Sequence, residues 1–144
     1  MNAPFVGLPF LLAALAAGGP CAYVTRADIV AVLHWSAGSG REVPYRLPQA
    51  RGTICRYESP EGTVLVTVPE RGSSFFNNND LVDPFKNGMG TRVAGIGATV
   101  TMFDNTAYVN KGTRNISVAV LPANGAADES ALVAFAKRIA RRLR

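Results

Sequence analysis

Hydrophobic residues between positions 25 and 36 recur with the spacing of a helix. Thr25 and Asp28 form a capping box, in which each side chain satisfies a backbone N–H of the first turn. The helix is expected to end near residues 34–36 because glycines follow, and the proline-bounded stretch 44–48 is expected to be a loop. The apolar face of this predicted helix consists of Ile29, Val32 and Leu33.

From residue 53 onward the hydrophobic period changes to two, which is typical of β-strands. Residues 53–58 and 63–68 predict a hairpin, because the Ser-Pro-Glu-Gly sequence at 59–62 is favourable for a type I turn. The valines of the second strand would face a helix, while the other face of the sheet would be only partly exposed to solvent. Further antiparallel strands are predicted over residues 92–94, 99–103, 106–110 and 115–121.

A second helix is predicted after Asp128, which can cap its first turn. These elements together predict an α+β fold, an antiparallel sheet with an N-terminal and a C-terminal helix packed against it. The basic last turns complement the helix dipole, and they also offer a peripheral contact with an anionic membrane. The apolar stripe of the helix consists of Leu132, Phe135, Ala136, Ile139 and Leu143. Its basic residues are Lys137, Arg138, Arg141, Arg142 and Arg144.

The first residues of the chain form an uncharged, apolar leader. Ala14 and Ala16 offer a cleavage site, so we predict a signal peptide over residues 1–17 and a single domain over residues 18–144. The apolar run is too short and too interrupted by proline to span a bilayer. Because residues 1–3 lack a basic side chain, a different start codon or an ordinary N-terminal helix is the alternative. We expect an exported protein that is periplasmic, secreted or associated with the cell envelope.

The chain contains two cysteines, Cys21 and Cys55. In an oxidising compartment an even pair predicts one disulfide, which would stabilise the domain by about 4 kcal/mol in the chain-entropy model. Lipid attachment at Cys21 is the alternative, although Pro20 fits poorly before a modified cysteine. The sequence thus leaves open whether the mature protein is free or lipid-anchored.

Composition indicates a folded and cationic domain. The 144 residues are 48% hydrophobic and 17% charged, which argues against intrinsic disorder. The formal net charge of +5 draws an exported protein toward anionic envelope polymers and lipid head groups. Nucleic-acid binding is not expected, because the basic residues are not interleaved with a known reading motif and export separates the protein from cytoplasmic DNA.

An Asn-rich segment in the middle of the chain carries clustered aromatic residues. They predict either a short packed helix or an exposed lid, and an exposed cluster would bind an unknown envelope protein or small ligand. Two acidic residues in this segment lack the regular spacing of calcium ligands, so no metal is predicted there. The candidate binding surface consists of Phe75, Phe76, Asp80, Asp83 and Phe85.

No motif of the sequence indicates catalysis. His34 is the single histidine, and no Gly-x-Ser-x-Gly or similar element accompanies it. Residues 95–97 lack the third glycine of a dinucleotide fingerprint, and a tight passage of the backbone explains them better. We therefore expect no catalytic residues, no metal and no cofactor.

The chain presents short motifs in a fixed order: residues 21–25 before a capped helix, residues 55–57, residues 93–97 and the closing helix. In this order it resembles a broad bacterial family of small exported proteins or lipoproteins of unknown function, which begin with a Cys-x-Leu-Leu-Thr-like element. The resemblance implies a disulfide between Cys21 and Cys55 and an α+β sandwich like the Mog1/PsbP fold. It transfers no activity. Departures from the family pattern include Ala98 after the Gly-x-Gly element and His34, where the first helix usually ends in glycine.

Two function classes follow from these observations. The first is a non-catalytic envelope module that binds a protein, a peptide or a small ligand through the sheet surface or the aromatic segment. The alternative is an inhibitor or sensor of an envelope enzyme, such as a cell-wall hydrolase, whose acidic cleft the positive charge would meet. A hydrolase that uses His34 is a distant third.

Overall fold

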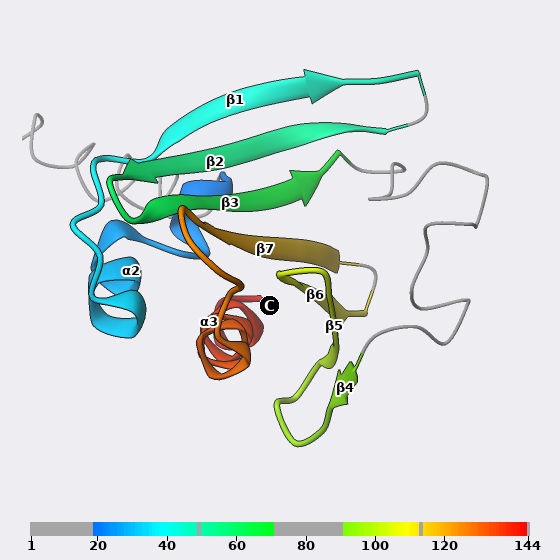
Figure 1. The fold of residues 1–144 in the computed structure, drawn as a ribbon. Helices are drawn as coiled ribbons and strands as arrows, with labels where there is room; N and C mark the ends of the chain where they lie inside the picture. The colour runs from blue at the N-terminus through cyan, green and yellow to red at the C-terminus, as the bar shows by residue number, and fades with distance from the viewer. Residues whose placement is uncertain (1–18, 49, 71–90, 113, 144) are drawn as a thin grey trace, which may run out of the picture.

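The computed structural model describes residues 19–48, 50–70, 91–112 and 114–143. In this part of the chain a seven-stranded sheet is covered on one face by helices (Figure 1). The helical elements are η1 (Pro20–Ala22), α2 (Arg26–Leu33) and α3 (Glu129–Arg142). The strands are β1 (Arg41–Arg46), β2 (Arg51–Ser59), β3 (Gly62–Pro69), β4 (Thr91–Val93), β5 (Thr99–Phe103), β6 (Thr106–Lys111) and β7 (Arg114–Pro122).

The strands lie in the order β1-β2-β3-β7-β6-β5-β4, and all neighbours are antiparallel. The register places Cys55 of β2 beside Val66 of β3, Val66 beside Val118 of β7, and Val118 beside Ala107 of β6. All four side chains are fully buried on the face that carries the helices. We call the opposite face the open face.

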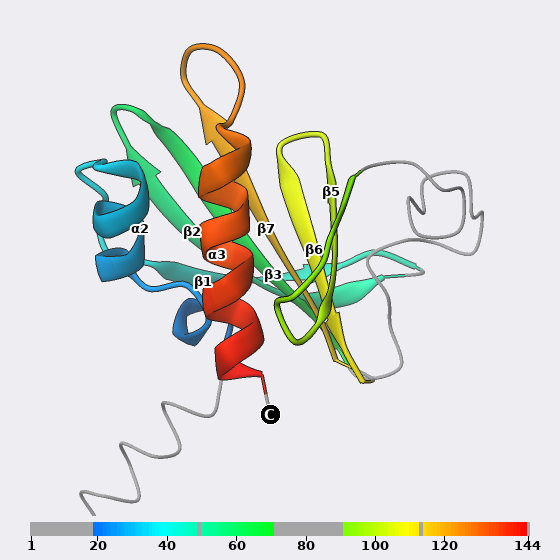
Figure 2. The same ribbon diagram turned by 90° about the horizontal axis from the view of Figure 1, so that it is seen from below.

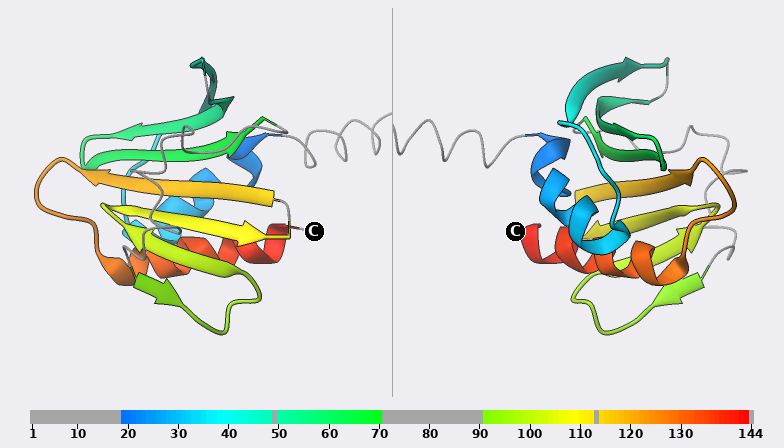
Figure 3. Two further views of the ribbon diagram at one scale, coloured as in Figure 1. Left: turned by 90° about the vertical axis from the view of Figure 1, so that its right-hand side faces the viewer. Right: turned by 60° about the vertical axis from the view of Figure 1, so that its left-hand side comes forward.

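Helix α3 lies across β6 and β7, and α2 lies beside α3 on the same face of the sheet (Figures 2 and 3). Phe135 and Ile139 of α3 are completely buried, as the predicted apolar stripe requires. Asp128 caps this helix by accepting a hydrogen bond from the backbone N–H of Ser130. The predicted α+β architecture, with an antiparallel sheet and two helices packed against it, is confirmed.

Local sequence signals account for most of the element boundaries. The capping box of Thr25 and Asp28 is present at the start of α2. The turn at residues 59–62 joins β2 to β3, and Asp104 and Asn105, both with positive φ angles, form the turn between β5 and β6. The glycines at 95 and 97 also have positive φ, but a Cβ added at either would meet nothing within 4 Å. The positive φ angles therefore favour glycine at these two positions. The close approach of neighbouring atoms that we expected there is not found.

Strand β1 corrects one prediction. The stretch 44–48 was expected to be a loop, but Pro44 lies inside β1, paired with Thr53 of β2. Cys55 accordingly lies in the second strand of the chain and not in the first. Proline is tolerated here because β1 is an edge strand, where an N–H on the outer side is not needed by the ladder. Pro44 and the charged residues of β1 hide the alternation that would have indicated a strand.

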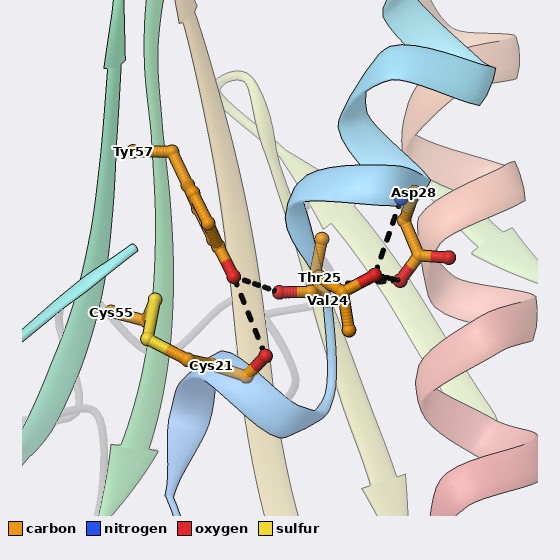
Figure 4. Close-up of a disulfide and its surroundings, with 6 residues drawn as sticks. All are labelled: Cys21, Val24, Thr25, Asp28, Cys55 and Tyr57. Carbon is orange, nitrogen blue, oxygen red and sulfur yellow. Dashed lines mark hydrogen bonds between the residues drawn. A yellow bond between two sulfur atoms is a disulfide. The ribbon is translucent and has the colours of Figure 1, made fainter. Parts of the chain in front are cut away.

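The N-terminal segment is fixed to the sheet by a disulfide between Cys21 and Cys55, whose Cα atoms are 5.1 Å apart (Figure 4). Beside it, the Tyr57 hydroxyl donates a hydrogen bond of 2.6 Å to the carbonyl oxygen of Val24. Burial raises the pKa of Tyr57 to about 12, and the negative charges of Asp28 and Glu42 add to this effect. Tyr57 therefore stays a hydrogen-bond donor at all physiological pH values.

Asp28 joins the two helices. The residue is only 7% exposed. Its carboxylate completes the capping box of α2 and also pairs with two arginines of α3. Arg142 Nη1 lies 2.5 Å from Oδ2 of Asp28, and Arg138 Nε lies 3.1 Å from Oδ1. Arg142 also donates to the carbonyl oxygen of Tyr23, over 2.7 Å. Burial acts to raise the pKa of Asp28, but the hydrogen bonds from Arg142 and Thr25 outweigh it and hold the pKa below its ordinary value.

No helix within the described ranges is long and apolar enough to cross a membrane.

Loss of the disulfide should lower the free energy of unfolding by about 4 kcal/mol, because the bond closes a loop between residues 34 positions apart. The double variant C21S/C55S compared with the oxidised protein in urea unfolding measures this difference. Intact mass should also rise by about 2 Da on reduction of the unlabelled protein, since one S–S bond gains two hydrogens. Equal urea midpoints for the two proteins would contradict the prediction.

Replacement of Asp28 by asparagine should cost about 2 kcal/mol of stability at pH 7, because it leaves two arginines without their shared carboxylate. Since the folded pKa of Asp28 is lowered, its contribution is complete above about pH 4 and is lost as pH falls through the folded pKa. The stability difference between wild type and D28N should therefore shrink toward zero in acid. The control is D104N at an exposed turn residue, which should stay close to wild type at every pH. A stability difference between wild type and D28N that stays constant with pH would contradict this prediction.

Candidate functional site

The aromatic surface predicted from the sequence lies outside the described residues. This applies to Phe75, Phe76, Asp80, Asp83 and Phe85 alike, so the structure provides no test of that prediction. The other surface that we predicted for binding, the sheet surface, is described over most of its area. The sheet surface is therefore the candidate site.

The open face of the sheet contains a groove of about 270 Å³ between the β1–β2 hairpin and the strands β3, β7 and β6. Its volume is near the lower end of the range for small-molecule sites. No local sequence pattern indicates this groove, because five strands contribute to its lining and each supplies only one or two side chains. Its principal lining residues are Tyr45, Leu47, Ile54, Leu65, Tyr108 and Ala119. We call it the open-face groove.

Exposed apolar side chains lie on the same sheet face as the open-face groove. Five large hydrophobic residues of the described chain are exposed, and four of them lie on this face or at its edge. Leu47 lines the groove and is 61% exposed, while the register places Val43, Phe103 and Leu121 on the same face as Leu65 and Ile54. Scattered exposed residues need no explanation, but Leu47 at the groove and Val43 on the same face of the same hairpin place exposed apolar surface beside a groove, which is typical of an interaction site.

Tyr45 forms one wall of the groove by lying over Gly52, its cross-strand partner. A Cβ added to Gly52 would come within 2.7 Å of the Tyr45 ring, so the absence of a side chain there lets the ring lie flat on the strand. The Tyr45 hydroxyl oxygen is buried and has no hydrogen-bond partner within the described chain. Burial raises the pKa of this hydroxyl, so it remains a donor without an acceptor.

Two arginines flank the groove at its other end. Arg41 and Arg56 are directly opposite each other in the β1–β2 ladder, and Arg56 is in turn opposite Leu65, which lines the groove. Like charges in such positions repel. Glu58 compensates only one of them, because it forms an ion pair with Arg56. That hydrogen bond lowers the pKa of Glu58, and the charge of Arg41 lowers it further.

A second depression of about 670 Å³ lies between α2 and α3. His34, Asp128 and Ser130 all line it, which brings together the residue types of a hydrolytic triad. However, the described chain shows no hydrogen bond from the His34 side chain to either partner, and Asp128 accepts instead from the backbone of Ser130. Arg138 at its edge is paired with Asp28. Asp128 and Arg138 in this cleft are thus engaged in capping and pairing the helices, whereas Tyr45 and Arg41 at the open face have no such partner among the described residues.

His34 ends α2 in the left-handed conformation, with φ of 59°. Glycine is favoured at this position, because a side chain makes the conformation costly. The sequence identified His34 correctly as a residue at the end of the helix.

The basic residues of α3 differ in their availability to an outside partner. Arg138 and Arg142 form ion pairs with Asp28, while Lys137 and Arg141 are exposed. Arg144 lies outside the described residues. The cationic surface of this helix is therefore smaller than the sequence suggested. In the described parts of the chain, no group of three or more His, Cys, Asp or Glu residues could hold a metal ion.

Comparisons of the chain with models of protein families, with curated proteins and with solved structures found no match.

Replacement of His34 by glycine should raise the free energy of unfolding by about 0.5–1 kcal/mol, because glycine adopts the left-handed conformation without a steric penalty. The matched control is H34A, which keeps the penalty and should remain near wild type. Urea unfolding of the three proteins measures both effects. If H34G proves no more stable than H34A, the strain assigned to this residue does not exist.

Proposed function

We propose that this protein is an exported, non-catalytic binding module that holds an apolar ligand on the open face of its sheet. The observation that carries the proposal is the open-face groove, with the exposed Leu47 in its lining and the exposed Val43 on the same face of β1. A monomeric domain gains nothing from leaving these side chains in water, whereas a ligand that covers them would gain roughly 25 cal/mol per Å² of apolar surface buried.

Export is supported by the Cys21–Cys55 disulfide, since such bonds persist in oxidising compartments and are rare in the cytosol. In the structure the Cys21 sulfur is bonded to Cys55, which favours the disulfide over lipid attachment at this residue. The signal peptide predicted over residues 1–17 agrees with this location. Membership of the bacterial family described above, with its Mog1/PsbP-like sandwich, is part of the same proposal and is supported by the motif order and by the arrangement of sheet and helices.

A titration with the uncharged dye Nile red tests the binding function, because its fluorescence rises when it leaves water for an apolar site. The wild type should bind the dye in a saturable manner. L47N, which makes one wall of the groove polar, should weaken binding by about threefold to tenfold, in line with roughly 1 kcal/mol for a partly exposed leucine.

The control for this prediction is L121N. Leu121 is an exposed leucine of the same sheet face that does not line the groove. L121N should therefore bind the dye like the wild type. Absence of saturable binding, or equal effects of the two variants, would remove the groove as the binding site.

A further inference from the structure

We infer that the ligand of the open-face groove is a fatty acid, with its carboxylate at Arg41 and Arg56 and its alkyl chain along the groove. This inference rests on the function proposed above and adds the ligand class. Its basis is a single surface that joins an apolar strip to an incompletely neutralised pair of cations.

The cationic end is built into the ladder. Arg41 and Arg56 face each other across β1 and β2 on the open face, and only Arg56 has a carboxylate partner, Glu58. In the described chain Arg41 forms no ion pair, although it lies near enough to Glu58 to affect its pKa. An incoming carboxylate would relieve the repulsion between the two guanidinium groups and accept paired hydrogen bonds from one of them.

The apolar part begins next to these arginines. Along β1, the open face presents Arg41, Val43 and Tyr45 in turn, followed by Leu47 beyond the end of the strand. These residues span about 20 Å at the rise of a β-strand, which suits an extended alkyl chain. Ile54 and Leu65 form the floor beside this row. The charge is thus at one end of the strip and apolar contacts follow it, as in a single-chain amphiphile.

A peptide partner fits the same region less well. An extended peptide would add to the free edge of β1, but Pro44 offers no N–H there and Arg41, Glu42 and Arg46 charge the edge. The hydrogen bonds that give affinity to an added strand are therefore interrupted at its centre. The open face, and not the edge, is the available surface.

The inference is tested by displacement of Nile red with three probes of equal chain length, namely dodecanoate, dodecanol and dodecyltrimethylammonium. All are used at pH 8 and below the concentrations at which they form micelles. The wild type should bind dodecanoate about threefold to tenfold more tightly than dodecanol, as expected for a partly exposed ion pair. The cationic probe should bind most weakly, and added salt should reduce the preference for dodecanoate.

R41Q should abolish the preference for dodecanoate while leaving dodecanol binding unchanged. The matched control is R46Q, which removes the same charge from the same strand at a position that the register places on the opposite face. R46Q should keep the preference. If wild type binds dodecanoate and dodecanol equally, or if R41Q and R46Q behave alike, the ligand class is wrong although the groove still binds. If the dye binds but neither dodecanoate nor dodecanol displaces it, the ligand class is wrong; if the dye itself does not bind, the binding function fails.

Discussion

The covalent bond between Cys21 and Cys55 is the constraint on which the arrangement of layers depends. It holds η1 against β2, so the chain must enter α2 at one place on the sheet, beside Tyr57. That position brings Asp28, the third residue of α2 and a member of its capping box, within reach of Arg138 and Arg142 of α3. A helix of only eight residues would have little stability alone. Here it is fixed at its start by a disulfide, a cap and two ion pairs, and together with α3 it covers one face of the sheet.

Because the helices cover one face, the other face has to be explained separately. Its cross-strand rows contain apolar residues between polar ones, so it is neither a second core nor an ordinary wet surface. Tyr45 shows this clearly, since a buried phenol without an acceptor is a cost that the folded domain bears in the absence of a partner. The same face carries two opposed arginines, and one glutamate on β2 pairs with Arg56. The opposed arginines gain free energy when a negatively charged ligand covers them. In the larger cleft between the helices, Asp128 and Arg138 are already paired, which is why the open face is the better candidate.

Local chemistry made much of the fold predictable from sequence. The Thr25–Asp28 capping box, the turn at 59–62 and the cap at Asp128 are short-range signals, and each is present in the structure. Strand β1 was missed because an edge strand can contain a proline and four charged or aromatic residues without the alternation of a central strand. The pairing of Asp28 with Arg138 could not be read from sequence, since 110 positions separate them. The open-face groove depends on the register of five strands, and no local pattern encodes it.

The distribution of the cations shows how a net positive charge can mislead at the level of sequence. Lys111 donates to the carbonyl oxygens of Ala140 and Leu143 and so completes the C-terminal end of α3, where a positive charge also complements the helix dipole. Arg114 donates to the Tyr23 hydroxyl, and the two arginines of α3 are paired with Asp28. These four cations hold the layers together and add little to an interaction surface. The basic helix that first draws attention in the sequence thus uses two of its arginines in structural ion pairs, whereas Arg41 of the β1–β2 hairpin forms no ion pair among the described residues and lies on the same sheet face as the apolar groove.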